Sequence, residues 1–376
     1  MIPFNVPPST GNEKKYVLSA MGSDILSGHG TFNLCCQRWF EKNLPCDRAL
    51  LTPSCTAALE LAAILLDIKK DDEIIMPSFT FPSTANAFAL RGARIVFIDV
   101  EPDTMNLNAE LIEPAITKKT KAIVPVHYAG AACDMEAIME ISKRHSLFVI
   151  EDAAQGMMSD FKGKALGTIG HLGTFSFHET KNYTSGGEGG LLLINDEKFI
   201  ERAEIIQEKG TNRSQFHRGQ IDKYQWVDIG SSFLLSEIQA AYLYGQLKDA
   251  EKIKRSRLES WNHYFEELIT LDETSKIDCP KVQRKSDHNA HIFYIKTKNI
   301  EERTNFISYM EQKEISAVFH YVPLHSSKAG QKFSRFHGQD RFTTVESEKL
   351  VRLPLWYGMT ESDRCRVIDA VKSFFF

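Results

Sequence analysis

The stretch Thr174-Phe175-Ser176-Phe177-His178-Glu179-Thr180-Lys181 begins as a short apolar strand and ends on a lysine. The glycine-rich turn Gly186-Gly187-Glu188-Gly189-Gly190 follows and leads into a second apolar run. Ser176 is suited to contact a phosphate, and Lys181 to form a Schiff base with an aldehyde. A single lysine is more often a solvated surface charge, so the role of Lys181 depends on which other residues the fold places near it.

Short apolar runs repeat on either side of this stretch. We expect seven strands, at Ala49–Thr52, Glu73–Met76, Arg94–Ile98, Ala122–Val126, Leu147–Ile150, Thr174–Phe177 and Gly190–Ile194. Most of them lack alternation of apolar and polar residues, as is typical of strands covered on both faces. Helical segments at Thr56–Asp67 and Asp134–His145 lie between strands. The pattern predicts a largely parallel α/β sheet that binds its ligands at the carboxyl ends of the strands.

A second region begins near Ser236, which forms a capping box with Gln239. The helical pattern continues to about Leu268 and carries the chain out of the sheet. Farther on, the sequence predicts strands at His291–Lys296 and Ala317–Tyr321 and helices at Glu301–Lys313 and Glu361–Phe374. We predict a large α/β domain over residues 1–245 and a smaller α+β domain over residues 246–376.

The composition excludes several classes of protein. A net charge of −4 argues against nucleic acid or an acidic membrane as the main partner. The longest apolar runs, such as Leu61–Leu66, are far too short to span a membrane, and Met1–Asn5 does not resemble a signal peptide. Seven cysteines without a CxxC pair indicate reduced thiols. We therefore expect a cytoplasmic protein.

Histidines provide no evidence for a metal. His288 and His291 lie three residues apart, but no second pair of ligands stands nearby, and a helical or loop surface explains them equally well. We predict no metal site.

Two further segments complete the chemistry. Ser54-Cys55-Thr56 follows a strand and opens a helix, which is a place for an anion. Asp152, at the end of the strand Leu147–Ile150, needs a cationic partner to stay ionised in an apolar setting. Each segment alone more often serves as a helix cap. Together with Lys181 they match the needs of pyridoxal 5′-phosphate, which has a phosphate, a ring nitrogen and an aldehyde.

Nucleotide-binding loops are absent from the sequence. Neither GxxxxGK[ST] nor a strand–GxGxxG–helix unit occurs, which argues against a nucleoside triphosphatase and a Rossmann dehydrogenase.

Over essentially its whole length, from Ile2-Pro3-Phe4 to Leu353-Pro354-Leu355, the sequence resembles the DegT/DnrJ/EryC1/StrS family of sugar aminotransferases. The most specific string is Phe175–Lys181 followed by Gly187–Gly190. The resemblance implies a fold-type I enzyme that uses pyridoxal phosphate, with pyridoxamine phosphate as an intermediate. It also implies a homodimer with the active site at the interface.

The family's functional residues carry over by position. Lys181 matches the Schiff-base lysine and catalytic base, and Asp152 matches the acid that pairs with the ring nitrogen. Gln155 matches a residue near the cofactor's oxygen face, and Phe81 matches the aromatic side chain that stacks on the ring. The predicted phosphate contacts are Ser54, Cys55, Thr56 and Ser176. Polar residues in loops near the family's site segments are candidates for sugar binding, namely Tyr183, Arg213, His320 and His325.

One segment departs from the family. Relatives often read Gly-x-Asn-x-Arg where this chain has Gly230-Ser231-Ser232-Phe233-Leu234. In relatives the Asn reaches across the dimer to the neighbour's cofactor phosphate. Ser232 takes its place with a shorter side chain, and Leu234 replaces the Arg.

The expected reaction follows from the family members that are most similar in sequence. Phe177–Gly190, Glu208–Gln215 and Phe319–His325 are similar to enzymes that convert dTDP-4-keto-6-deoxyglucose to dTDP-4-amino-4,6-dideoxygalactose with glutamate as donor. A 3-amino product or an equatorial 4-amino product is an alternative. Sugar dehydratases of this family carry His in place of Lys181, and a non-catalytic cofactor-binding regulator would show a broken site.

Overall fold

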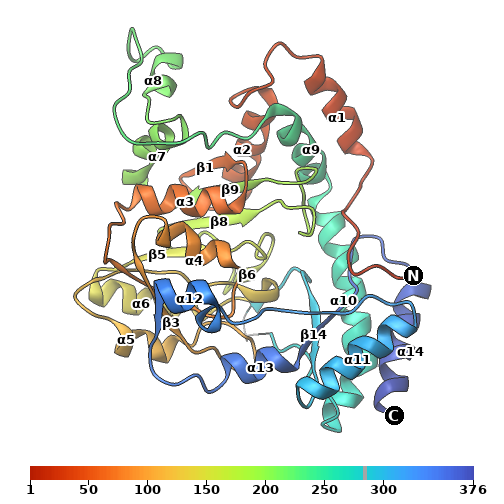
Figure 1. The fold of residues 1–376 in the computed structure, drawn as a ribbon. Coiled ribbons are helices and arrows are strands. Elements are labelled where there is room, and N and C mark those ends of the chain that lie inside the picture. Colours follow the sequence, from red (N-terminus) through yellow and green to blue (C-terminus); the bar gives the residue numbers. More distant parts are fainter. Residues whose placement is uncertain (283–285) are drawn as a thin grey trace.

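A central sheet of eight strands organises the computed structural model, which describes residues 1–282 and 286–376 (Figure 1). The strand order is β1-β9-β8-β5-β4-β2-β3-β13. Its strands are β1 (Arg48–Thr52), β2 (Glu73–Pro77), β3 (Arg94–Ile98), β4 (Thr120–Ile123), β5 (Phe148–Asp152), β8 (Leu172–Ser176), β9 (Gly190–Ile194) and β13 (Ser334–Phe336). Within this sheet, as described, β9 runs in the direction opposite to that of the other strands. The prediction of seven strands in a largely parallel sheet is confirmed.

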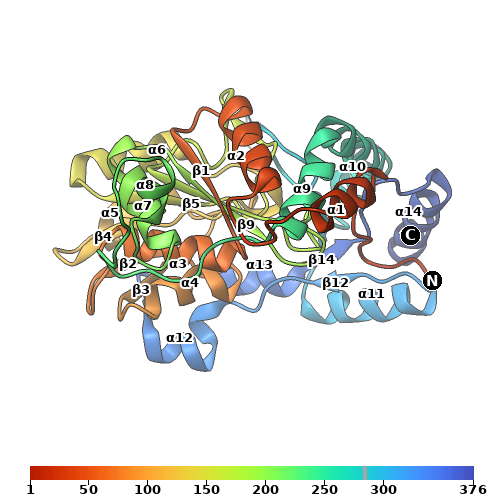
Figure 2. The same ribbon diagram turned by 90° about the horizontal axis from the view of Figure 1, so that it is seen from above.

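Helices cover both faces of the sheet. One face is covered by α2 (Thr31–Asn43), α6 (Met135–His145) and α9 (Glu237–Lys248), and the other by α3 (Cys55–Leu65), α4 (Pro82–Ala89) and α7 (Ile200–Gln207). Figure 2 shows α2 and α6 on one side and α3 and α4 on the other. Leu50 and Leu51 of β1 consequently belong to different hydrophobic clusters. This double burial explains why the strands lack alternation.

A second, antiparallel sheet supports the smaller domain. It consists of β11 (Phe293–Lys296), β14 (Leu350–Leu353) and β12 (Val318–Phe319). The helices α10 (Ala250–Glu273), α11 (Ile300–Gln312) and α14 (Glu361–Phe375) pack on it around Trp261, Phe293 and Phe306. The helical pattern predicted from Ser236 onward is interrupted at Asp249, where α9 ends and α10 begins.

The C-terminal half returns once to the large sheet. β13 follows α12 (Lys328–Phe333) and pairs in parallel with β3, with Ser334 opposite Ile95. The sequence pattern does not predict this eighth strand, and the domain division at residue 245 stays a prediction. The remaining elements are α1 (Asn12–Met21), α5 (Ile112–Ala115), α8 (Arg213–His217), α13 (Thr343–Lys349), β6 (Asp160–Phe161), β7 (Lys164–Ala165), β10 (Ser286–Asp287) and the 3-10 turns Ala109–Leu111, Tyr128–Gly130, Glu197–Phe199 and Leu324–Ser326.

Strand direction brings the predicted site segments together. Because β9 is antiparallel to both β1 and β8, and β8 is parallel to β5, the carboxyl ends of β1, β5 and β8 lie at one edge of the sheet. Thr52, Asp152 and Ser176 end these three strands. Across the described ranges, no helix has the length and apolar character needed to cross a membrane.

Candidate active site

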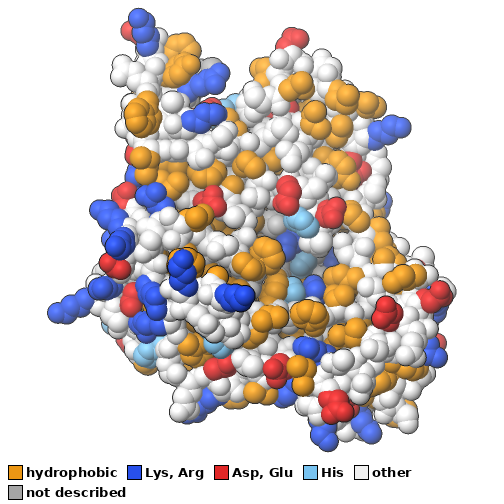
Figure 3. Space-filling view, viewed as in Figure 1, with side chains coloured by type: hydrophobic (Ala, Val, Ile, Leu, Met, Phe, Trp, Pro, Cys, Tyr) orange, Lys and Arg blue, Asp and Glu red, His pale blue; other side chains and the backbone are white. Residues whose placement is uncertain are grey.

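A cavity of about 1060 Å³ lies at this edge of the sheet, against the smaller domain. Figure 3 shows a hollow between the two domains with histidine side chains in it. Nine of the residues predicted from the sequence line the cavity: Ser54, Cys55, Thr56, Phe81, Asp152, Gln155, Ser176, Lys181 and His320.

The start of α3 forms one end of the cavity. Ser54 caps the helix, because its Oγ accepts the Ala57 N–H at 3.0 Å. The amides of Cys55 and Thr56 belong to the first turn, which has no carbonyl partners within the helix and carries its positive end. Gly190 passes so close that a Cβ there would lie 2.3 Å from the Ser54 carbonyl carbon and 2.4 Å from the Cys55 nitrogen. This glycine-lined helix start fits a phosphate.

Neutral groups surround this anion site. Burial raises the pKa of Cys55, so the thiol stays protonated, and its Sγ lies 3.5 Å from Thr174 Oγ1. Thr56 Oγ1 donates to Ser83 Oγ at 2.7 Å. Ser176 pairs with Gly190 across the β8–β9 ladder. No carboxylate among these groups would repel a phosphate.

Asp152 is buried at the end of β5. Its Oδ2 accepts the Thr84 hydroxyl at 2.7 Å, and its Oδ1 accepts the Ala154 N–H at 3.2 Å. Burial raises the pKa of Asp152, whereas these hydrogen bonds and the charge of Lys181 oppose that shift. A cationic ring nitrogen beside it would favour the carboxylate.

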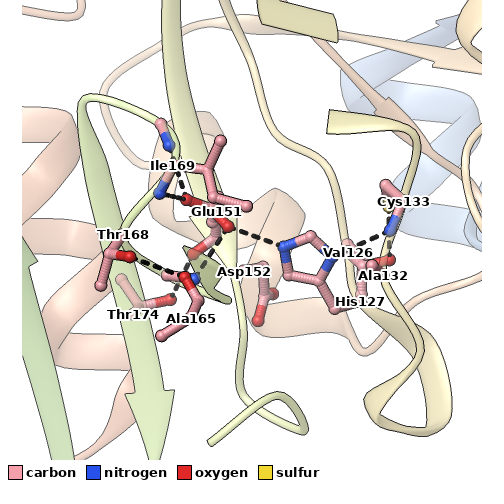
Figure 4. Close-up of polar contacts among 12 residues, drawn as sticks. Val126, His127, Ala132, Cys133, Glu151, Asp152, Ala165, Thr168, Ile169 and Thr174 are labelled. Carbon is pink, nitrogen blue, oxygen red and sulfur yellow. Dashed lines mark hydrogen bonds and ion pairs between the residues drawn. The ribbon is translucent and has the colours of Figure 1, made fainter. Parts of the chain in front are cut away.

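Glu151 precedes Asp152 and is held by a separate network (Figure 4). His127 Nε2 lies 2.9 Å from a Glu151 oxygen, and the Cys133 N–H donates to His127 Nδ1 at 3.1 Å. Because Nδ1 accepts this amide, the ring proton is on Nε2, facing the carboxylate. Three amides also donate to Glu151, those of Gly167, Ile169 and Gly170. The His127 N–H donates to the Asp152 carbonyl at 3.2 Å, so this network positions Asp152.

Lys181 lies in the turn after β8, where its N–H donates to the His178 carbonyl at 2.9 Å. Burial lowers the pKa of the Lys181 amine, and the negative charge of Asp152 opposes this shift. The amine makes no hydrogen bond to any residue that the structure describes. A lysine in this state is suited to act as a nucleophile and as a base.

Aromatic and amide groups close the cavity wall. Gln155 accepts the Ala129 N–H at 2.7 Å and donates to the Tyr321 hydroxyl at 3.2 Å. Phe81 is 58% exposed although it is large and apolar, and its ring centroid lies 6.4 Å from that of Tyr321. An aromatic face left open to a cavity is suited to stack on a flat ring.

Tyr183 and His325, predicted from loops, do not line this cavity. Tyr183 is buried in the hydrophobic core and donates its hydroxyl to the Ala250 carbonyl at 3.0 Å. His325 bonds Ser78 Oγ through Nδ1 at 2.7 Å, and its Nε2 lies 3.1 Å from Asp340.

Arg213 and Ser232 also lie outside the cavity of this chain. Arg213 is exposed on α8, with its guanidinium 5.8 Å from the ring centroid of Tyr224. Ser232 is exposed and forms a β-bridge with Glu208. Their predicted roles remain untested by this arrangement.

The cavity contains residues that the sequence analysis missed. His291 is buried in its wall, with Nδ1 at 2.8 Å from Asn182 Oδ1, so a surface position, one explanation for the spacing of His288 and His291, does not apply to it. Arg352 of β14 also lines the cavity and donates from Nη2 to the Phe319 carbonyl at 3.1 Å. No local pattern marks either residue, because Arg352 is placed by the pairing of β14 with β11 and β12, and His291 by its contact with the distant Asn182.

The donor set as a whole fits pyridoxal phosphate. The Gly190 cradle and the α3 amides suit its phosphate, Asp152 suits its ring nitrogen, Phe81 suits its ring face, and Lys181 suits its aldehyde.

Comparison with known proteins agrees with this geometry. The model of the DegT/DnrJ/EryC1/StrS aminotransferase family matches residues 8–372. GDP-perosamine synthase of Caulobacter vibrioides is 31% identical, over 97% of this chain and 96% of that protein. UDP-4-amino-4-deoxy-L-arabinose–oxoglutarate aminotransferase of Shewanella sediminis is 32% identical, over 86% and 85%.

A solved structure, S. venezuelae DesV in complex with a ketimine intermediate, superposes with a TM-score of 0.90 at 27% identity, covering 99% of this chain and 98% of that chain. The chain therefore belongs to the DegT/DnrJ/EryC1/StrS aminotransferase family and is a pyridoxal-phosphate-dependent sugar aminotransferase.

Proposed function

We propose that this enzyme transfers the amino group of glutamate to C4 of dTDP-4-keto-6-deoxyglucose and forms dTDP-4-amino-4,6-dideoxygalactose. The observation that carries the proposal is the likeness of Phe177–Gly190 and Phe319–His325 to enzymes of that activity. A relative whose name specifies a 4-amino sugar nucleotide and oxoglutarate supports the position of the amine and the choice of donor.

Each residue of the cavity has its own role in the proposed reaction. The bound cofactor supplies the carbonyl that carries the amino group and the ring that withdraws electrons. Lys181 takes the proton from the α-carbon of glutamate and later delivers a proton at C4 of the sugar. Asp152 keeps the ring nitrogen protonated, and Ser54, Cys55, Thr56 and Ser176 hold the phosphate. Phe81 and Gln155 orient the ring.

The cavity is large enough for a cofactor and a nucleotide sugar, since about 1060 Å³ exceeds the usual range for one drug-sized ligand. Burial and the charge of Arg352 lower the pKa of His320, which keeps it neutral. Its Nδ1 lies 3.1 Å from the Tyr128 hydroxyl. A neutral histidine there can hydrogen-bond a sugar hydroxyl. Tyr183 and His325 remain candidates that would act through neighbours.

We further propose a homodimer with the site at its interface. Large apolar side chains are exposed on α1, before α2, on α8 and on the segment after α8: Leu18, Met21, Ile25, Leu26, Phe216, Tyr224, Trp226, Val227 and Ile229. His29, just before α2, lies with its Nε2 2.8 Å from a Glu208 oxygen, and Glu208 forms a β-bridge with Ser232, so the segments before α2 and after α8 belong to one side of the molecule. Ser232 lies between them, where it is available to a neighbouring subunit. Arg213 would reach a nucleotide diphosphate only across such an interface.

A panel of keto-sugar nucleotides, each incubated with glutamate and the holoenzyme, tests the substrate. NMR of the product should show an axial 4-amine on a galacto-configured sugar. An equatorial 4-amine or a 3-amine would overturn this assignment and leave the aminotransferase class intact. The cytoplasmic location stays a prediction, which cell fractionation checks.

A further inference from the structure

Arg352 is a cation in the cavity wall without an acidic partner. Within the described ranges it forms no ion pair, and its one hydrogen bond runs from Nη2 to the Phe319 carbonyl at 3.1 Å. Its Nε is buried without an acceptor. The guanidinium carbon lies 4.5 Å from the ring centroid of Phe4, which also lines the cavity. Strand β14, the Phe319 carbonyl and the Phe4 ring thus hold the guanidinium in place before any ligand arrives.

The groups around Arg352 do not compensate its charge. The phenols of Tyr128 and Tyr321 and the imidazoles of His291 and His320 stand near it, and burial keeps all four neutral. Arginine remains protonated in proteins. A half-buried cation with no carboxylate beside it is costly in the free protein, and an anionic ligand would remove that cost.

The position of Arg352 relative to Lys181 indicates which anionic ligand Arg352 would bind. Arg352 lies over the ring of Phe4, and the next residue, Asn5, donates its side-chain amide to the Glu179 carbonyl at 3.5 Å, two residues before Lys181. Arg352 and Lys181 therefore line neighbouring parts of one cavity. In an α-amino acid the carboxylate and the reacting amine share one carbon. In a nucleotide sugar the phosphates stand at C1, across the ring from C4. A cation near the lysine therefore suits the carboxylate better than the diphosphate.

We propose that Arg352 binds the α-carboxylate of the amino-acid donor and of the keto acid that leaves. The planar guanidinium matches a carboxylate with charge-assisted hydrogen bonds. This inference rests on the proposed amino-acid half-reaction but is independent of which keto sugar accepts the amine.

The test compares Arg352→Gln with the parent in each half-reaction. Holoenzyme with pyridoxal phosphate is mixed with glutamate, and the change in cofactor absorbance gives the apparent Kd. Enzyme loaded with pyridoxamine phosphate is mixed with the keto-sugar nucleotide. Loss of a charged hydrogen bond should weaken glutamate binding about 10–100-fold, whereas the sugar half-reaction should keep its apparent Kd. Calorimetry of 2-oxoglutarate with the pyridoxamine phosphate form gives a readout independent of turnover.

Arg303→Gln is the matched control. Arg303 also lies over an aromatic ring, that of Phe319 at 5.5 Å, donates to the Ser347 carbonyl at 3.3 Å and has a buried Nε without an acceptor. It does not belong to the cavity lining as described, so its substitution should leave the Kd of glutamate unchanged.

Three outcomes with Arg352→Gln would overturn the proposal. If only the keto-sugar nucleotide binds more weakly, Arg352 binds the diphosphate instead. The proposal is also wrong if glutamate and the keto-sugar nucleotide are weakened equally, or if neither binds more weakly. If Arg352→Gln fails to fold, Arg352→Lys, which retains the charge, should still bind 2-oxoglutarate more weakly than the parent, and unchanged binding would count against the inference. An intact donor half-reaction with no keto sugar accepted would instead contradict the proposed function alone.

Discussion

At the scale of single residues, the site depends on two groups whose charged forms are disfavoured: Asp152, which is buried, and Lys181, which is half-buried. Burial lowers the pKa of Lys181 and raises the pKa of Asp152. Both shifts run toward the neutral form, so the amine gives up its proton more readily than a free lysine does, and a cation beside the carboxyl group would favour its ionisation. Both properties suit a cofactor that carries an aldehyde and a protonated ring nitrogen.

Replacing Lys181 by Ala should abolish turnover, because the same amine is the attachment point and the base. The rate should fall by far more than ~10²-fold, the low end for one acid–base group. Steady-state assays with glutamate and a keto-sugar nucleotide measure this loss. Lys162→Ala is the control, since Lys162 pairs with Glu136 away from the cavity. Turnover within tenfold of the parent would contradict the assignment.

Replacing Asp152 by Asn should lower the activity of the enzyme without lowering its stability. The barrier should rise by about 3 kcal/mol, as when other electrostatic groups are removed from closed sites. A raised folded-state pKa means that ionised Asp152 costs stability once the pH exceeds both its unfolded and its folded values. At a pH above both of these pKa values, the cofactor-free Asn variant should therefore unfold at the same temperature as the parent or at a higher one. An unchanged reaction rate in this variant would mean that the Asp152 carboxylate has a structural role and does not act on the ring nitrogen.

At the scale of elements, strand β9 and the start of α3 form the phosphate cradle through a close approach of two backbones. Gly190 makes this approach possible, since a Cβ there would overlap the Ser54–Cys55 peptide. The network of Glu151 and His127 plays a similar part at the end of β5, where it fixes the backbone beside Asp152.

Replacing Gly190 by Ala should push the start of α3 away and weaken the cofactor site. We expect a loss of about 1–3 kcal/mol in stability, as for other overpacked positions, together with weaker retention of pyridoxal phosphate on dialysis. Gly22→Ala is the control, because Gly22 has a φ of −86° and its nearest neighbour would lie 3.7 Å from the Cβ. Unchanged cofactor retention in Gly190→Ala would show that the cradle tolerates displacement.

At the scale of the whole molecule, exposed apolar side chains gather on the side formed by α1, α8 and the segment after it. Figure 3 shows hydrophobic groups in the upper part of the molecule, over these elements. Trp226 is 79% exposed, which is unusual for a side chain of its size. Such a surface is typical of an interface.

The protein should therefore form a dimer that buries well above the ~1,600 Å² of a standard complex. Trp226→Asp should shift the dimer toward monomer and reduce turnover, as measured by light scattering and by assay. Ile300→Asp serves as control, since Ile300 is 46% exposed on α11 of the smaller domain. An active monomer of the parent at micromolar concentration would refute the dimer.

The sequence by itself predicted the large sheet and most of the cofactor site. Its strands are short apolar runs buried on both faces, and the groups that matter stand at their carboxyl ends, as Asp152 and Ser176 do. In a parallel sheet these ends share one edge. Local patterns were therefore sufficient to predict that Ser54, Asp152 and Lys181 lie in one cavity, as they do.

The tertiary structure alone decided the opposite wall. Arg352 faces the cavity because β14 pairs with β11 and β12, which places it opposite Tyr294 and Val318. His291 and the added strand β13 likewise depend on contacts between segments far apart in the chain. Strand register sets which face a side chain occupies, and a shift of one residue reverses it. Since register is fixed by packing over long distances, no local run of residues records it.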